Sequence, residues 1–155
     1  MPVRDPRLSL ELVNRRTGQT IASVVEIADT RRTRRRGLLG RDVMDPSAAL
    51  ILTPCCSIHT AFMRFAIDAV FVDRDGRVRR IVRELAPWRA AWCARAHAVV
   101  ELAAGALRSR EVLVGDAIYV LPVRGTEPDE GEAGVVSSAS KSLRMTAANP
   151  AWLGS

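Results

Sequence analysis

The chain has 155 residues, the size of one ordinary domain of roughly 100–200 residues, and 48% of them are hydrophobic and 26% charged. This composition excludes a wholly disordered chain and a fibrous protein, and a chain of this length can bury a core without disulfide staples. The formal net charge is +6, yet Lys141 is the only lysine among 23 basic side chains. Because surfaces that bind nucleic acid usually use lysine as well as arginine, the bias favours a GC-rich genome, whose codons favour arginine, over a nucleic-acid partner.

Cysteine usage and hydropathy bear on the compartment. The three cysteines are Cys55, Cys56 and Cys93, an odd number with two adjacent, and this is not the pattern of a disulfide framework. Such a pattern fits a reducing cytoplasm. The N-terminal residues lack the apolar stretch of a secretory signal, and no run approaches the length that a membrane helix needs. We therefore expect a cytoplasmic protein that does not insert into membranes.

Short segments with alternating hydrophobicity follow one another along the chain, separated by turns that contain glycine or aspartate. They predict strands over residues 8–13, 19–28, 48–52, 57–65, 67–72, 77–85, 97–102 and 117–123. Asp29 and Thr30 can cap a short helix over residues 31–39, and residues 106–110 can form one helical turn. Strands and long helices do not alternate, so the sheet should be mainly antiparallel. The predicted fold class is α+β, mainly β: a compact barrel-like antiparallel sheet with one or two short helices.

The composition changes after Arg124. Residues 125–155 hold four acids near their start, then serine, alanine and glycine, and they have no strand periodicity. We therefore predict one barrel-like domain over residues 1–124 and a disordered tail over residues 125–155.

An acidic residue within an apolar strand is the most informative polar position. Asp68 lies between Ile67 and Ala69, and a buried carboxylate needs a partner. Arg64, His59 or backbone N–H groups could supply it. Two interpretations stay open: a polar knot that pins a hairpin, or a polar cleft with Phe62, Trp88 and Trp92 as walls. The cleft would be lined by His59, Thr60, Arg64 and Asp68.

The cysteines and histidines suggest two other kinds of chemistry. Thiol, imidazole and thioether groups cluster at Cys55, Cys56, His59 and Met63, a soft set suited to copper(I) or zinc. The paired spacings of zinc sites are absent, so we assign no metal and no cofactor. A nucleophilic pair would instead join Cys55 or Cys56 to His59 or His97, with a third group to orient the imidazole ring.

The run Arg31–Arg36 has arginine at five of its six positions. It could contact phosphate or RNA, or it could be a solvated helix face. No aromatic residues that would stack on bases lie nearby, which disfavours nucleic acid as the partner.

Several motifs together resemble one family. The run Arg36-Gly37-Leu38-Leu39-Gly40-Arg41 is similar to the entry motif of the domain of unknown function 192 family, an uncharacterised family of bacteria and archaea. The central signature of that family resembles Ser57-Ile58-His59-Thr60, Met63-Arg64-Phe65, Ile67-Asp68 and Val70-Phe71-Val72-Asp73. Asp75-Gly76-Arg77-Val78, Val100 to Gly105 and Gly115-Asp116 follow in the family's order.

This resemblance covers about residues 20–122, with departures at Ala66, where the family usually has proline, and at Ala61, where it commonly has an aromatic residue. It implies a compact, barrel-like antiparallel sheet with one or two short helices and no particular activity. Its signature polar positions are His59, Thr60, Arg64, Asp68 and Asp73.

We interpret the chain as a non-catalytic binding module with a polar cleft for a small ligand or peptide. The predicted ligand-binding residues are His59, Thr60, Arg64, Asp68 and Trp88. In this hypothesis Arg64 donates to a ligand oxygen, Asp68 orients Arg64 or accepts from a ligand hydroxyl, and Trp88 stacks. Two alternatives stay open: an enzyme that depends on a Cys/His pair or a metal, and a binder of an anionic partner through Arg31–Arg36.

Overall fold

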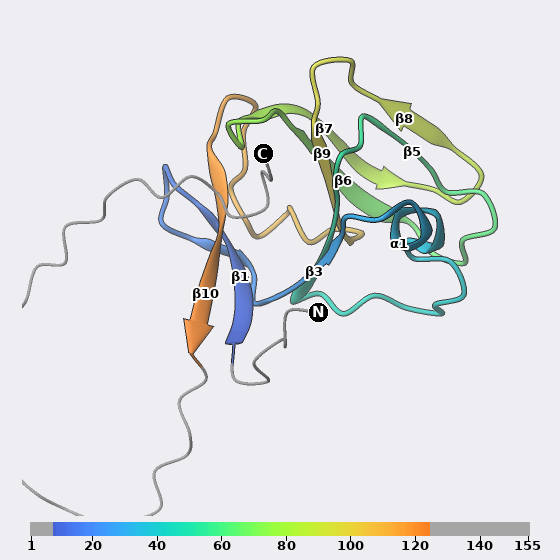
Figure 1. Cartoon of the computed structure of the whole chain (residues 1–155), viewed down its shortest axis with the longest axis horizontal. Helices are drawn as coiled ribbons and strands as arrows, with labels where there is room; N and C mark the ends of the chain where they lie inside the picture. The colour runs from blue at the N-terminus through green and yellow to red at the C-terminus, as the bar shows by residue number, and fades with distance from the viewer. Residues whose placement is uncertain (1–7, 125–155) are drawn as a thin grey trace, which may run out of the picture.

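The computed structural model describes residues 8–124, and this range contains ten strands and one α-helix (Figure 1). The elements are β1 (Leu8–Asn14), β2 (Thr20–Ala22), β3 (Val24–Ala28), α1 (Arg31–Arg36), β4 (Ala48–Leu52), β5 (Ser57–His59), β6 (Ile67–Val72), β7 (Val78–Leu85), β8 (Ala90–Trp92), β9 (Ala98–Ala103) and β10 (Ile118–Arg124). No helix within residues 8–124 is long and apolar enough to cross a membrane. The predicted tail, residues 125–155, lies outside the described range.

The strands form three sheets, ordered β10–β1–β2, β3–β4–β9–β6–β7 and β5–β8. All strand pairs are antiparallel except β3–β4, so the prediction of an α+β, mainly β fold is confirmed. The predicted barrel-like sheet is not a closed barrel within residues 8–124, because the strands divide among three sheets and the chain changes sheets at Ser23. Consecutive strands β2 and β3 thereby become edges of two different sheets. The single strand predicted over residues 19–28 is these two strands.

One parallel unit was missed by the sequence prediction. Strands β3 and β4 pair in parallel from Val24↔Ala48 to Ala28↔Leu52, with α1 between them. The side chain of Thr30 caps α1, and the helix ends at Gly37, whose φ of 44° favours glycine. The helix is therefore shorter than the predicted residues 31–39. The sequence predicted a helix between these two strands, but local alternation carries no information on whether two strands pair in parallel or antiparallel.

Three further predicted elements are corrected by the structure. The predicted strand 57–65 ends at His59, because Met63 N donates to Thr60 O at 3.1 Å and the chain turns there. Residues 86–96, predicted as a loop, contain β8, which pairs with β5. Residues 106–110 form turns and not a helix.

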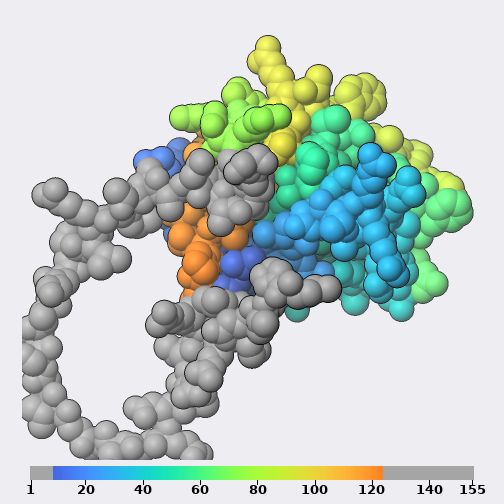
Figure 2. Space-filling view, viewed as in Figure 1, coloured from blue at the N-terminus to red at the C-terminus, as the bar shows by residue number. Residues whose placement is uncertain are grey.

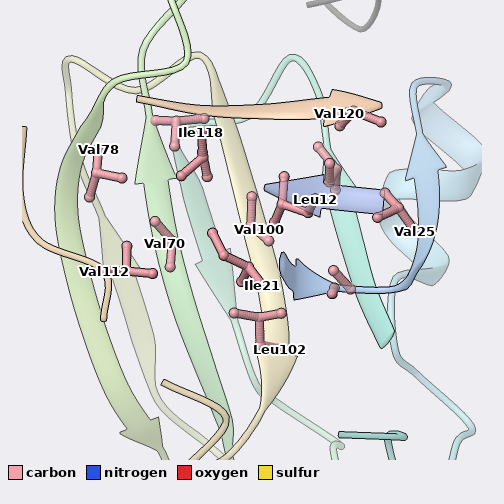
Figure 3. Close-up of a cluster of buried hydrophobic side chains, with 14 of the residues drawn as sticks. Leu12, Ile21, Val25, Val70, Val78, Val100, Leu102, Val112, Ile118 and Val120 are labelled. Carbon is pink, nitrogen blue, oxygen red and sulfur yellow. The ribbon is translucent and has the colours of Figure 1, made fainter. Parts of the chain in front are cut away.

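The five-stranded sheet is the middle of three layers, and its interior strand β6 is buried at every position. Alternate side chains of its strands enter two hydrophobic clusters. The first lies against the three-stranded sheet, where Figure 3 shows Leu12, Ile118 and Val120 facing Val70 and Val100. The second lies against α1 and the small β5–β8 sheet and includes Leu38, Ile58, Met63 and Ala91. A strand buried on both faces explains the near-continuous apolar run over residues 67–72.

Candidate functional site

Most of the predicted site residues lie on the β5–β8 sheet and the loops at one end of it (Figure 1). In this sheet His59 is opposite Ala90, and Ser57 is opposite Trp92. These four residues are exposed, whereas Ile58 and Ala91 between them are buried in the core. The small sheet therefore presents one face to solvent and anchors the other to the five-stranded sheet.

Thr60 ties together the two loops that follow β5 and precede β8. It is fully buried, and its hydroxyl donates to Ala86 O at 2.6 Å and accepts from Arg89 N at 2.9 Å. Its backbone N–H donates to Arg89 O at 2.8 Å, and its carbonyl accepts from Trp88 N at 3.0 Å. Because each polar atom of Thr60 is used within the fold, this residue positions the site and is not available to a ligand.

The two joined loops bring Phe62 and Trp88 together at the surface. Their ring centroids are 4.6 Å apart with an interplanar angle of 59°, and the residues are 73% and 60% exposed. Aromatic rings in contact with each other usually bury most of their surface. Here the pair packs ring against ring and leaves its outer surface free, as expected of a site that receives a partner.

The backbone at both aromatic residues is strained. Phe62 has φ of 65° and Trp88 has φ of 63°, in the left-handed region that bulky side chains rarely occupy. Each such residue costs on the order of 1 kcal/mol and persists only where the surroundings hold it, often at binding sites. The hydrogen bonds of Thr60 hold the backbone of both loops in this conformation.

Basic groups lie beside the exposed aromatic rings. The guanidinium carbon of Arg80 is 5.9 Å from the Trp92 ring centroid, and Arg80 Nη1 donates to Trp92 O at 2.5 Å. Arg89 Nη1 donates to Trp88 O at 3.2 Å, which places a second guanidinium close to the Phe62–Trp88 pair. We call the exposed residues His59, Phe62, Trp88, Arg89 and Trp92 the aromatic surface.

Two predicted site residues, Arg64 and Asp68, lie apart from this arrangement. Arg64 is exposed and forms an ion pair with Asp42. Asp68 is fully buried, and its carboxylate accepts from Glu84 N at 2.8 Å and from Leu107 N at 3.1 Å. Of the partners proposed from the sequence, Asp68 therefore uses backbone N–H groups, as in the polar-knot interpretation, and it does not join His59, Thr60 and Arg64 in a cleft.

The position of Asp68 explains why the knot is needed. Opposite it, the β6–β7 ladder passes from Ile67↔Leu85 to Ala69↔Val82, so two residues of β7 face a single residue of β6. Glu84, one of the two, has φ of 52°, and its N–H is the group that Asp68 accepts. Asp68 thus satisfies the backbone at a strand bulge.

The cysteines lie at the other end of the β5–β8 sheet. Cys55, Cys56 and His97 line an open hollow of about 380 Å³ together with Pro54, Ser57 and Ala96. Burial raises the pKa of the Cys55 thiol, which donates to Ser57 O at 3.0 Å, so this thiol is not activated as a nucleophile. Within residues 8–124 no three His, Cys, Asp or Glu side chains are grouped so that they could hold a metal ion.

A second buried acid, Glu101 in β9, was not singled out from the sequence. It is 4% exposed, and Oε2 has no hydrogen-bond partner. Burial raises the pKa of Glu101 to about 7, partly opposed by the charge of Arg41, which itself pairs with Glu26 at 2.8 Å. The signal was available, because Glu101 interrupts an apolar run as Asp68 does.

The run Arg31–Arg36 forms α1, which lies at the surface and is shown in blue in Figure 2. Arg34 Nη1 donates to Asp29 O at 2.7 Å and to Thr53 O at 3.2 Å, so it supports the fold. The other four arginines are exposed.

Comparisons with known proteins place this fold in a family. The model of the DUF192 family, described as an uncharacterized ACR, matches residues 12–120. The chain belongs to the DUF192 family. The motifs quoted from the sequence therefore identified the family correctly, and its residues 12–120 include the aromatic surface and both buried acids of this DUF192 domain. No curated protein matches the chain.

Two solved structures resemble this DUF192 domain. A "putative transcription regulator" from Sinorhizobium meliloti 1021 is 22% identical with a TM-score of 0.64, and the match covers 77% of this chain and 98% of that one. A protein of unknown function from Novosphingobium aromaticivorans DSM 12444 is 20% identical with a TM-score of 0.61, over 76% and 89% of the two chains. At these identities the likeness establishes the fold of the DUF192 domain and not its activity.

Proposed function

We propose that this domain is a non-catalytic binding module for a small ligand or peptide, which packs against Phe62 and Trp88. The carrying observation is that two mostly exposed aromatic rings lie 4.6 Å apart on backbone that is strained at both residues. A fold that only needed to cover its core would bury these rings or replace them by small polar residues. Strain held in place at an exposed aromatic pair supports preorganisation for a partner.

The neighbouring groups indicate the chemistry of the ligand. An aromatic pair favours a flat or apolar face, such as a proline ring, an aliphatic side chain or the C–H face of a sugar. The Arg89 guanidinium beside Trp88 and the exposed His59 favour carbonyl, carboxylate or hydroxyl oxygens next to that face. The proposed ligand therefore combines an apolar face with adjacent oxygens.

The other functions considered from the sequence receive less support. The raised pKa of the Cys55 thiol argues against Cys55 as a nucleophile at neutral pH. The exposed arginines of α1 have no aromatic residue among them that would stack on a nucleotide base. The three free thiols are compatible with the cytoplasmic location proposed from the sequence.

A thermal-shift screen of the full chain against sugars, short proline-containing peptides and nucleotides tests the proposal. A ligand at one hundred times its Kd adds about 2.7 kcal/mol, which raises the melting temperature by several degrees. We expect the shift to be lost in Phe62→Ala and in Trp88→Ala. It should persist in Val114→Ala, a matched change of an exposed apolar residue on the turn before β10.

Two results would overturn this proposal. A ligand that stabilises the Phe62→Ala and Trp88→Ala variants as much as the unaltered protein binds elsewhere. A screen in which no sugar, peptide or nucleotide shifts the melting temperature would contradict a small-ligand function. In the first case, Trp92→Ala would test whether the binding site lies further along the aromatic surface.

A further inference from the structure

The end of the β5–β8 sheet away from the aromatic pair brings two cysteines together. The ladder pairs His59 with Ala90, then Ile58 with Ala91, then Ser57 with Trp92. Just beyond the last of these pairs, Cys93 N donates to Cys56 O at 2.9 Å, so the backbones of the two cysteines adjoin at this end of the sheet. These two residues, 37 positions apart in the sequence (93 − 56), are therefore neighbours in the fold.

Backbone neighbours of this kind meet the distance requirement of a disulfide. Hydrogen-bonded antiparallel pairs have Cα atoms about 5.5 Å apart, within the roughly 4.4–6.8 Å span of disulfides. Both cysteines carry free thiols in this structure.

The surroundings distinguish Cys56 from its neighbour Cys55. Cys56 is exposed and lines the hollow beside His97, so a small reagent can reach its sulfur. Cys55 is half-buried, packs against the core, and its Sγ is held by Ser57 O at 3.0 Å. Cys93 is also half-buried against the core, so it is suited to react second, with a sulfur already attached to the adjacent strand.

We propose that Cys56 and Cys93 are a redox modification site that forms a reversible disulfide by exchange with a low-molecular-weight disulfide such as oxidised glutathione. The Cys56 thiolate attacks one sulfur of the reagent, breaks its S–S bond and releases one glutathione thiolate. The Cys93 thiolate then attacks Cys56 Sγ in this mixed disulfide and releases the second glutathione thiolate. Each cysteine loses one proton and together they lose two electrons, which reduce one oxidised glutathione to two thiols.

The disulfide would close a loop that contains all the residues of the aromatic surface. Residues 57–92 lie between the two cysteines, including Thr60, Phe62 and Trp88. A covalent link at one end of a two-stranded sheet restricts opening of the sheet and reduces the entropy of the unfolded chain. The modification therefore stabilises the β5–β8 sheet, whether or not the aromatic surface binds the proposed ligand.

The experiment treats the full chain with oxidised glutathione and counts free thiols by alkylation and mass spectrometry. We expect the number of free thiols to fall from three to one, and mass spectrometry to find the Cys56 and Cys93 peptides joined by a disulfide. The melting temperature should be higher by several degrees. Cys55→Ser is the matched control and should still form the link. Cys56→Ser should remain unlinked, whereas Cys93→Ser should stop at a mixed disulfide on Cys56.

Reversibility is measured by equilibrating the chain in mixtures of reduced and oxidised glutathione. The oxidised fraction should fall as the proportion of reduced glutathione rises, because an exposed disulfide exchanges readily. A link that involves Cys55, a link between two chains only, or three thiols that survive treatment would each overturn the proposal. Thermal melts of the reduced variants show whether each one folds, so a lost link is not confused with an unfolded chain.

Discussion

The central strands and the small β5–β8 sheet use polar and apolar side chains in opposite ways. In β6 and β9 the acids Asp68 and Glu101 are buried inside an apolar layer. At the end of the β5–β8 sheet the aromatic residues Phe62 and Trp88 are exposed, while the polar Thr60 beneath them is buried. Of these buried polar groups, Asp68 and Thr60 form hydrogen bonds with the backbone, whereas Glu101 Oε2 has no hydrogen-bond partner. The two exposed rings contact each other at the surface, and this difference directs the functional proposal to the surface.

The largest expected effect comes from removing the carboxylate of Asp68. Asp68→Ala leaves the N–H groups of Glu84 and Leu107 without an acceptor, so we expect a loss of about 4 kcal/mol in the free energy of unfolding. Urea unfolding measures it. Asp68→Asn keeps one acceptor oxygen and should lose about half as much. If Asp68→Ala lost ligand binding without loss of stability, Asp68 would belong to the binding site, and this buried acid would not have a purely structural role.

Glu101 should make stability depend on pH in a defined window. Its pKa is raised from 4.5 unfolded to about 7 folded, so the folded state binds more protons between these values. The free energy of unfolding should therefore fall as pH rises from 4.5 through 7, by up to about 3 kcal/mol, and then level off.

Glu101→Gln should remove that fall, and urea unfolding of both proteins at pH 5 and pH 8 measures the difference. Asp116, whose pKa is lowered to about 2, mainly by its hydrogen bond from Arg16, acts below about pH 4. The two effects are therefore separated along the pH axis. Equal pH dependence in the Glu101→Gln variant would contradict the role assigned to Glu101.

A smaller effect tests the strain at the aromatic pair. Trp88→Gly and Trp88→Ala both remove the ring, but only glycine is at ease with φ of 63°. We expect Trp88→Gly to be more stable than Trp88→Ala by about 1 kcal/mol, whereas glycine in ordinary strand backbone is less stable than alanine. The matched pair Trp92→Gly and Trp92→Ala, in strand β8, should show the ordinary order. The same order at both sites would show that the left-handed backbone at Trp88 carries no strain.

The smallest effect concerns the exposed ion pair of Arg64 with Asp42. Because solvent screens both partners, Arg64→Ala should change the free energy of unfolding by less than about 0.5 kcal/mol. It should also leave ligand binding at the Phe62–Trp88 pair unchanged. A loss of binding in this variant would return Arg64 to the role predicted from the sequence.

The fold class and the family were predictable from the sequence, because they depend on local patterns. Period-2 alternation and apolar runs located β1, β4, β6, β7 and β9 to within one or two residues, and the motifs around His59 and Asp68 named the family. The position of Asp68 in an apolar strand correctly predicted that its buried carboxylate has hydrogen-bond partners. Its partners could not be read, because Glu84 and Leu107 are 16 and 39 positions away from it.

Three features were decided only by the tertiary structure. The break at Ser23 sends β2 and β3 to different sheets, since both halves are equally good strands and only packing chooses their neighbours. The exposed aromatic pair exists because Thr60 holds two distant loops in left-handed backbone, and no local propensity favours that backbone for Phe62 or Trp88. The backbones of Cys56 and Cys93 adjoin because the pairing of β5 with β8 brings the ends of these two segments together. Alternation and composition act between near neighbours, whereas register and strain arise from contacts between segments far apart in the chain.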